Sequence, residues 1–527
     1  MFSLMYLLNA LTSRIFSRIG RLNPFNDSLD LDQHALRFRR ELKTKSGIKS
    51  STKRIILVEA NQIPSNQLAL AMTLPTISKF LNAKPVAFRV GATSTLQKFR
   101  QIFRHKLSIL STAGAKKILI IRKINTYPTG KVSELFGVYT KEDLENFILN
   151  GVYLGDLIYD EYLSSTHSAT VNFEDLKFQQ IFQDGVNYAR AWEKIFSKGN
   201  VSAICIWHDV YFYALPARAA FKFNVSVFSI TTRGVYRLTP EWPHVGLNPE
   251  KNDLLKVDSL VNRDSKEGNM IYSETNDKDI TLESDQVKLS EFFKSDNREK
   301  IRVLIANHIF FDAPHCYGKM FYPDFEVWLT KLSEIARETD YSWFLKPHPH
   351  APFWKENNLI ELFSKKNPKF KVLPIEISKE ELAGLGIDFV LTVHGTTSLH
   401  YAGDGYKVIN ASVNNPYNKY SFSFTPDSRE QYETVIRNLE QFDYKFKFGE
   451  VAEYIEHISR MELDNWLFKN HINYFEHFKT ANDAMSTQSY SYYLDSGNSR
   501  ELPEVEKALL NFLRSEDLNL NHSHFKD

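Results

Sequence analysis

The stretch WFLKPHPH at residues 343–350 joins an apolar run to a lysine and two histidines. Lys346 can offer a positive charge to a phosphate oxygen, and His348 can offer a hydrogen-bond donor. Pro347 and Pro349 restrict the backbone between them. A strand that ends in this way brings fixed donors to the mouth of a sheet. We therefore interpret Lys346, His348 and Pro349 as parts of a phosphate or nucleotide site.

A second candidate anion site ends the strand predicted at 388–395. Gly395 allows a tight turn, and Thr396, Thr397 and Ser398 supply hydroxyl and backbone N–H groups at the expected start of a helix. Taken alone, this pattern is typical of an ordinary helix N-cap. Beside the KPHPH segment on a nearby strand end, it indicates a phosphate site.

Further polar side chains follow the other predicted strands of this half. Histidine and aspartate are metal ligands, and a metallohydrolase would use such a set to activate water. These residues lie on different strand ends, however, without a compact signature such as H-E-x-x-H. We therefore predict no metal and interpret them as loop, cleft or donor-binding residues. They are His308, Asp312, His315, His400 and Asn415.

Short β-branched runs that alternate with helical patterns position these residues. The alternation occurs twice, and it predicts an α/β fold of two doubly wound Rossmann-like domains that face a cleft. In open parallel sheets, ligands bind beyond the carboxyl ends of the strands. The strands are predicted at 54–60, 84–90, 116–121, 201–207 and 225–230 in the first half, and at 302–310, 341–347, 370–375, 388–395 and 407–412 in the second.

The remaining segments complete the predicted domain organisation. An N-terminal amphipathic helix with its lead-in occupies 1–50, the first domain 51–240, a polar linker or surface excursion 241–300, the second domain 301–445 and a helical extension 446–527. In the N-terminal helix the cations follow the apolar residues, which is unlike a signal peptide. That helix either docks on the protein's own core or lies on an anionic membrane.

Composition excludes several classes of protein. The 527 residues are too many for one core, and 43% hydrophobic with 24% charged residues indicates a globular chain. The net charge of +2 argues against a strongly basic nucleic-acid surface. Cys205 and Cys316 fit a reducing compartment and offer no disulfide framework or cysteine metal cluster. No apolar run is long enough to span a bilayer.

The second half resembles the C-terminal domain of GT-B glycosyltransferases. It is similar to bacterial capsule and surface polysaccharide biosynthesis proteins, which share a K-x-HP strand end and a later Gly-Thr/Ser turn. The segments at 151–163 and 207–220 resemble the same group. The resemblance implies that His348, Pro349 and residues 396–398 grip the nucleotide and phosphate of a donor. Many such enzymes carry a glutamate after the turn, where this chain has His400, so the donor sugar stays open.

Sugar transfer with inversion also needs a base that removes the proton of the acceptor hydroxyl. In a two-domain cleft this base would come from the first half. Asp156 and Asp160 stand there at i, i+4 spacing, and His208 and Asp209 follow a predicted strand. Such carboxylates are also typical of helix caps and surface pairs. Among the four, the resemblance favours Asp160 or Asp156.

These observations predict a metal-independent glycosyltransferase. It would transfer a sugar from a nucleotide-sugar donor to a growing surface polysaccharide of capsule or O-antigen type, or to a lipid-linked acceptor. The alternatives are a sugar-nucleotide epimerase or polyol-phosphate transferase of related fold, and a catalytically idle protein that binds a glycan or a partner. No cofactor is predicted besides the nucleotide sugar. The His-Pro motif favours a cytidine nucleotide such as CMP, while uridine and guanosine donors stay open. We predict a cytoplasmic protein with optional contact to the inner membrane surface and no nucleic-acid partner.

Overall fold

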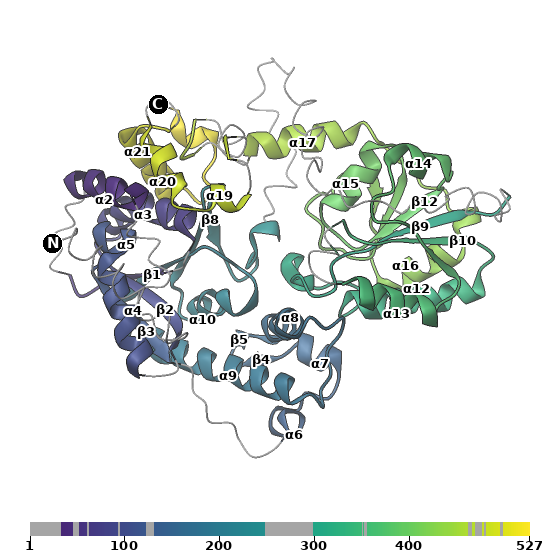
Figure 1. Cartoon of the computed structure of the whole chain (residues 1–527), viewed down its shortest axis with the longest axis horizontal. Coiled ribbons are helices and arrows are strands. Elements are labelled where there is room, and N and C mark those ends of the chain that lie inside the picture. Colours follow the sequence, from purple (N-terminus) through teal and green to yellow (C-terminus); the bar gives the residue numbers. More distant parts are fainter. Residues whose placement is uncertain are drawn as a thin grey trace, which may run out of the picture.

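A computed structural model of the chain shows two α/β domains side by side and a helical C-terminal region (Figure 1). The amphipathic helix predicted at the start of residues 1–50 lies outside the described residues. The same holds for nearly all of the linker predicted at 241–300. In the described part of the chain, no helix is long and apolar enough to cross a membrane. The described residues are 33–45, 52–60, 63–92, 95–122, 131–247, 299–349, 351, 356–461, 466–469, 477–478, 481–495 and 499–526.

The N-terminal domain is built on a six-stranded sheet. Its strands lie in the order β3 (Lys117–Arg122), β2 (Lys84–Ala92), β1 (Ile55–Glu59), β6 (Val201–Ile206), β7 (Ser226–Ile230) and β8 (Val235–Leu238). All neighbours are parallel except β7 and β8. Ile56, Leu57 and Val58 of β1 are fully buried, as expected for a parallel strand that is covered on both faces.

Helices cover both faces of this sheet. The helices of this domain are α2 (Gln33–Lys45), α3 (Pro64–Phe80), α4 (Thr95–Leu107), α5 (Ile109–Thr112), α6 (Val132–Phe136), α7 (Lys141–Glu145), α8 (Gly155–Thr166), α9 (Leu176–Phe196) and α10 (Leu215–Lys222). Short 3-10 turns occur at η2 (Tyr211–Tyr213) and η3 (Val245–Leu247), and a hairpin is formed by β4 (Ile148–Leu149) and β5 (Val152–Tyr153). The segment from α6 to α8, with the hairpin, is an insertion between β3 and α9.

The C-terminal domain contains a second six-stranded sheet, in which all neighbours are parallel. Its strands lie in the order β11 (Phe370–Val372), β10 (Ser342–Lys346), β9 (Arg302–Ala306), β12 (Phe389–Thr392), β13 (Lys407–Asn410) and β14 (Ser423–Phe424). The helical elements are η6 (Pro314–Tyr317), α12 (Phe325–Glu338), α13 (Asn357–Lys366), α14 (Lys379–Gly384), α15 (Thr396–Gly403), α16 (Arg429–Arg437) and η7 (Leu439–Gln441).

Both sheets share one topology. When the strands of each are numbered along the chain, the spatial order is 3-2-1-4-5-6, which is that of a Rossmann-type domain. The order reverses between β1 and β6 in the first sheet, and between β9 and β12 in the second. The predicted fold class is therefore confirmed, and ligands are expected beyond the carboxyl ends of the strands at these two switch points.

The last part of the chain returns to the N-terminal domain. Its elements are α17 (Glu450–Met461), α19 (Ala481–Ala484), α20 (Gln488–Leu494), α21 (Leu502–Arg514) and η8 (His522–Phe525). α17 lies between the two domains, and α20 and α21 lie beside α2 and α3 (Figure 1). Phe512 shares one apolar core with Ile56 and Val58. The Leu520 N–H donates to the carbonyl of Val235 in β8 at 2.8 Å. Residues from the predicted helical extension therefore complete the core of the first domain.

Candidate functional site

The carboxyl edges of the two sheets face each other across the domain boundary. His208 and Tyr211 follow β6, and Asp312 follows β9. The Tyr211 hydroxyl donates a hydrogen bond to Asp312 Oδ1 at 3.1 Å. Tyr211 has a φ of 52°, a left-handed conformation that bulky residues rarely adopt. The loops that follow the two switch-point strands are therefore in direct contact, so a ligand at either crevice lies close to the opposite domain.

His308 is the second residue after β9 and lies on the C-terminal side of this boundary. Its Nε2 accepts a hydrogen bond from the Val393 N–H at 3.2 Å and lies 2.9 Å from Thr392 Oγ1. Its ring stacks on Phe325 at 4.6 Å. Burial and the neighbouring imidazole of His394 hold the pKa of His308 well below its ordinary value. Because a backbone N–H can only donate, the single proton of the neutral ring sits on Nδ1, which makes Nδ1 a donor.

His394 lies two residues after the end of β12 in the same sheet. Its ring centroid is 5.1 Å from that of His308. Its Nε2 is 3.0 Å from the carbonyl oxygen of Pro314, so this nitrogen donates. Burial lowers the pKa of His394 to about 4. Both imidazoles are therefore uncharged at neutral pH. The single N–H of His394 is already donated to Pro314, so of the two rings only His308 has an N–H left to donate, on Nδ1.

The predicted glycine turn is formed as expected at the start of α15. Gly395 is the N-cap, and its φ of 83° with ψ of −168° is a conformation that is almost restricted to glycine. Thr396 is exposed and Thr397 is half-buried. The first-turn N–H groups have no partner within a helix. The Ser398 hydroxyl is instead buried and donates to Asn410 Oδ1 at 2.5 Å, which gives this side chain a structural partner.

The KPHP segment lies at the neighbouring strand end, because β10 pairs with β9. Lys346 and His348 are half-buried, and Pro349 is exposed. His348 is close enough to His308 to contribute to the lowering of its pKa. The structure thus brings the KPHP segment, His308 and the strand that leads into Gly395 to one place. The role of these residues in phosphate binding stays a prediction.

Asn307 lies at the same point and has an unusual environment. Its side chain is 3% exposed, and neither its amide oxygen nor its amide nitrogen has a hydrogen-bond partner among the described residues. Its backbone N–H donates to the Lys346 carbonyl at 3.1 Å. A buried amide without a partner is rare in proteins, and this one lies at the switch point of the second sheet.

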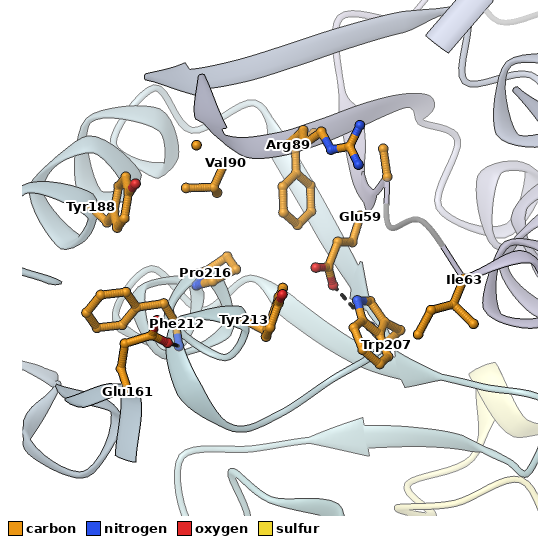
Figure 2. A pocket seen from close by; sticks show the side chains of 13 residues that line it. Glu59, Ile63, Arg89, Val90, Glu161, Tyr188, Trp207, Phe212, Tyr213 and Pro216 are labelled. Carbon is orange, nitrogen blue, oxygen red and sulfur yellow. Dashed lines mark hydrogen bonds between the residues drawn. The ribbon is translucent and has the colours of Figure 1, made fainter. Parts of the chain in front are cut away.

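On the N-terminal side, a pocket of about 530 Å³ opens at the carboxyl ends of β1, β2 and β6 (Figure 2). This is the switch point of the first sheet. The lining combines aromatic rings with two carboxylates and a guanidinium, so it suits a polar molecule that also has apolar faces. The lining residues are Glu59, Ala60, Ile63, Phe88, Arg89, Val90, Gly91, Glu161, Tyr188, Trp207, Phe212, Tyr213 and Pro216.

Glu59 is the last residue of β1, and its carboxylate is directed toward Trp207 (Figure 2). It is 8% exposed and accepts a hydrogen bond from the Trp207 backbone N–H at 3.3 Å. Burial raises the pKa of Glu59 to about 8, and this hydrogen bond and the charge of Arg89 offset only part of the effect. A carboxyl group in a pocket with a pKa near neutrality is a candidate general acid or base.

A second carboxylate of the pocket, Glu161, comes from the insertion. Its Oε2 accepts a hydrogen bond from the Phe212 N–H at 3.2 Å, so it connects α8 to the loop after β6. Trp207 and Tyr213 form an aromatic wall, with ring centroids 5.5 Å apart. In Figure 2 both rings lie on the side of the pocket opposite Arg89 and Val90.

Asp160 pairs with a histidine of the opposite domain. The segment is helical, as the i, i+4 spacing required, and Asp160 Oδ1 lies 2.6 Å from His315 Nδ1. The Glu145 carboxylate is 3.6 Å from Nε2 of the same ring. Burial alone would lower the pKa of His315, but the two carboxylates outweigh it and hold this pKa well above its ordinary value. The pair joins α8 to η6 and ties the domains together.

Asp156, one turn earlier, belongs to a separate buried network. Its Oδ2 accepts a hydrogen bond from Arg218 at 2.6 Å and lies 3.5 Å from His244 Nε2. Burial alone would raise the pKa of Asp156, but Arg218 and His244 lower it to about 2. Asp156 and Asp160 are both 2% exposed. Their assignment as the catalytic base stays a prediction, and each already has a structural partner.

A third network ties the insertion to the second domain at Asp324. This carboxylate caps α12 by accepting a hydrogen bond from the Val327 N–H. It also accepts hydrogen bonds from the hydroxyls of Tyr159 and Thr170, each at 2.5 Å. Lys141 lies 3.6 Å away. Hydrogen bonds and an ion pair at Asp324 therefore join the insertion of the first domain to the second domain.

The other predicted site residues are dispersed. His208 lies beside the pocket, where its buried Nδ1 has no hydrogen-bond partner among the described residues. Asp209 accepts a hydrogen bond from the Val245 N–H. His400 is on the exposed side of α15. Asn415 is buried, and its Nδ2 donates to the Ser412 carbonyl at 2.9 Å. His208 and Asp209 are neighbours in the loop after β6, whereas His400 and Asn415 lie in the C-terminal domain, apart from them.

Sequence reasoning missed Glu59, although a signal existed. The run RIILVE ends in a carboxylate at the first strand of a predicted parallel sheet. The same kind of position yielded His208 and Asp209 at the strand predicted at 201–207, but it was not considered at 54–60. Within the described residues, no group of three or more His, Cys, Asp or Glu side chains is placed to hold a metal ion.

Comparison with known proteins gives structural neighbours only. No family model and no curated protein matches the chain. UDP-GlcNAc 2-epimerase from Methanocaldococcus jannaschii is 15% identical, with 76% of this chain and 98% of that chain covered and a TM-score of 0.23. MurG from Acinetobacter baumannii is 10% identical, with 77% and 95% covered and a TM-score of 0.21. The wall teichoic acid polymerase TagF is 10% identical, with 94% and 100% covered and a TM-score of 0.20. Scores this low support no argument about what this chain does.

Proposed function

We propose that this protein is a glycosyltransferase that moves a sugar from a nucleotide-sugar donor to a hydroxyl of a surface-polysaccharide or lipid-linked acceptor. The observation that carries the proposal is the direct contact between the carboxyl edges of two Rossmann-type sheets. One edge offers neutral donors and a helix N-terminus, and the other offers an aromatic pocket with a protonatable carboxyl group. Transfer between two bound substrates needs these two kinds of site side by side.

We assign the donor to the C-terminal edge. The N–H groups at the start of α15, with the Gly395 turn before it, would bind phosphate oxygens. His348 and Lys346 would approach the same phosphate from the neighbouring strand. Nδ1 of His308 would add a third donor, and the buried amide of Asn307 would gain the partner that it lacks. As the bond to the sugar breaks, negative charge develops on the leaving phosphate, and these groups would stabilise it.

We assign the acceptor to the N-terminal pocket and the base to Glu59. Aromatic walls formed by Trp207 and Tyr213 suit the C–H faces of a sugar ring. The acceptor hydroxyl would attack the anomeric carbon as the bond from that carbon to the phosphate oxygen breaks. The hydroxyl proton would pass to the Glu59 carboxylate, and the nucleotide would leave with the electron pair of the broken bond. We choose Glu59 over Asp156 and Asp160 because those carboxylates are held in ion pairs.

A thermal-shift screen with CMP, CDP, UDP and GDP tests the donor site. A nucleotide at about a hundred times its dissociation constant should add roughly 2.7 kcal/mol to the stability of the folded chain. We expect one nucleotide to raise Tm and His348→Ala to abolish that rise. His400→Ala is the matched control, since His400 lies on the exposed side of the same region. Absence of stabilisation by every nucleotide would contradict the proposal.

The base is tested by separating binding from turnover. Glu59→Gln should keep the nucleotide-dependent rise in Tm, because Glu59 belongs to the other domain. It should lower transfer by about 10²- to 10⁴-fold, which is the usual contribution of general base catalysis. Transfer at the wild-type rate in this variant would exclude Glu59 as the base. Rapid interconversion of sugar nucleotides without an acceptor would instead identify an epimerase.

A further inference from the structure

One segment of the N-terminal domain is strongly basic, although the net charge of the whole chain is close to zero. Residues 60–133 contain twelve Lys and Arg and no Asp or Glu. The whole chain has a net charge of +2. Subtracting the +12 of this segment leaves a net charge of −10 on the remaining residues. This segment includes α3, β2, α4, α5 and β3. One flank of the N-terminal domain is therefore positively charged, while the remainder of the molecule is acidic.

The sheet register aligns several of these cations along its amino edge. The Lys84 N–H donates to the Arg54 carbonyl at 2.9 Å, and Val86 of β2 pairs with Lys117 of β3. Neighbouring strands lie about 4.8 Å apart, so the cations that open β1, β2 and β3 form a row. Lys79 and Lys106, at the ends of α3 and α4, are also exposed. This edge is opposite the carboxyl edge that carries the pocket.

Large apolar side chains are exposed on the same flank. Phe80 is 39% exposed at the end of α3, and Phe99 and Phe103 are 65% and 42% exposed at i, i+4 spacing on α4. α4 lies at the outer side of the N-terminal domain, away from the C-terminal domain (Figure 1). Exposed phenylalanines among lysines, in a segment that itself contains no carboxylate, form the pattern of a surface that enters the headgroup region of a membrane. A soluble polyanion without aromatic groups, such as polyphosphate, would pair with the lysines but would make no use of the phenylalanine rings.

We propose that this basic face, formed by Lys79, Lys84, Lys106 and Lys117 with Phe80, Phe99 and Phe103, docks on an anionic lipid bilayer. The lysines pair with lipid phosphates, and the phenylalanines enter the boundary between headgroups and acyl chains. The inference does not rest on the proposed glycosyl transfer. The carboxyl edge lies at the other end of the strands, so docking leaves the cleft between the domains open.

Co-sedimentation of the full chain with vesicles tests the docking. We expect binding to phosphatidylcholine vesicles that contain about a quarter phosphatidylglycerol, and loss of binding at high salt. Each lysine near an anionic surface contributes about fivefold to affinity, so Lys84→Gln with Lys117→Gln should weaken binding about 25-fold. Phe99→Ser should weaken it about tenfold. Phe99 is the most exposed of the three rings, so its replacement leaves the core intact.

The matched control lies on α13 of the other domain. Leu362 is 56% exposed there, and Lys365 pairs with Glu361. Leu362→Ser with Lys365→Gln should leave vesicle binding unchanged. Equal binding of the wild type to neutral and anionic vesicles would overturn the proposal. Wild-type affinity in the Lys84/Lys117 and Phe99 variants would overturn it too, as would binding to soluble polyphosphate without binding to vesicles. The variants of the basic face should keep the nucleotide-dependent rise in Tm. This result would show that the donor site is intact, so a loss of vesicle binding can be separated from a failure of the proposed transfer.

Discussion

Glu59 provides a direct physical test of the N-terminal pocket, because glutamine keeps its shape and removes its charge. In the folded chain burial raises the pKa of Glu59 to about 8, whereas its ordinary value is 4.5. The folded state therefore holds a proton that the unfolded state has released at neutral pH. The contribution of Glu59 to the free energy of unfolding is therefore fully present below about pH 4.5, and it is lost as the pH rises toward 8. Glu59→Gln removes this dependence.

The size of the effect follows from the two pKa values. Each pH unit between them corresponds to 1.36 kcal/mol, so the full penalty for charging Glu59 is about 5 kcal/mol. The group is 8% exposed, so solvent screening reduces this figure little. Relative to wild type, Glu59→Gln should be more stable by about 1 kcal/mol near pH 5 and by about 4 to 5 kcal/mol near pH 9. The Gln side-chain oxygen can still accept from the Trp207 N–H.

Urea unfolding at a series of pH values measures this difference. The wild-type and Glu59→Gln curves should diverge steadily between about pH 5 and pH 8 and then run parallel. Glu161→Gln is the matched control, since it removes the other carboxylate of the same pocket. A stability difference that stays constant across this range would refute the conclusion that Glu59 is buried with a raised pKa. The same base should give transfer an ascending pH limb near 8, because only the ionised carboxylate accepts a proton.

Three further changes test the domain boundary and the glycine turn. Asp160→Asn leaves the imidazolium of His315 without its main partner, so unfolding measurements should show a loss of stability of about 3 to 5 kcal/mol. Because the pKa of His315 is raised, this loss should be greatest below about pH 6.5 and should shrink at higher pH. A loss of stability that grows with pH would contradict the pairing. Gly395→Ala should cost about 1 to 3 kcal/mol and abolish stabilisation by nucleotide in the thermal-shift assay, whereas Gly405→Ala, at a φ of 86°, should cost stability without affecting nucleotide binding. Tyr211→Phe removes one hydrogen bond between the domains and should cost about 1 kcal/mol; domain opening measured by small-angle scattering should increase, and an unchanged profile would show that this bond does not hold the cleft.

The sequence was sufficient for the strands and the topology class, because buried parallel strands are continuous apolar runs. The run predicted at 54–60 is β1 (Ile55–Glu59), and that at 341–347 is β10 (Ser342–Lys346). Two edge strands were missed. β14 has two residues and β8 is an antiparallel addition of four, and neither is a continuous apolar run. The insertion between β3 and α9 also contains α6, α7 and α8, which a simple alternation of strands and helices does not predict.

The site was harder to predict because its chemistry comes from distant partners. The strand ends with KPHP and Gly395 could be identified locally, since each lies directly after an apolar run. Asp160 and His315 are 155 positions apart, and their pairing depends on how the two domains meet. Glu59 owes its raised pKa to burial, and the residue that donates a hydrogen bond to it, Trp207, lies 148 positions later. Spacing within one segment cannot reveal either relation.

The return of the chain to its first domain has a consequence for the order of events during synthesis. The face of the first sheet that bears Ile56 and Val58 needs Phe512 and its neighbours in α21 to close its core. The second domain, in contrast, builds its sheet from one continuous stretch between β9 and β14. Since a domain folds once its own residues have left the ribosome, the second domain can finish first. During synthesis one face of the first domain therefore stays uncovered until α21 has been made. A chain truncated before α21 should fail to complete the first domain, although that domain is synthesised first.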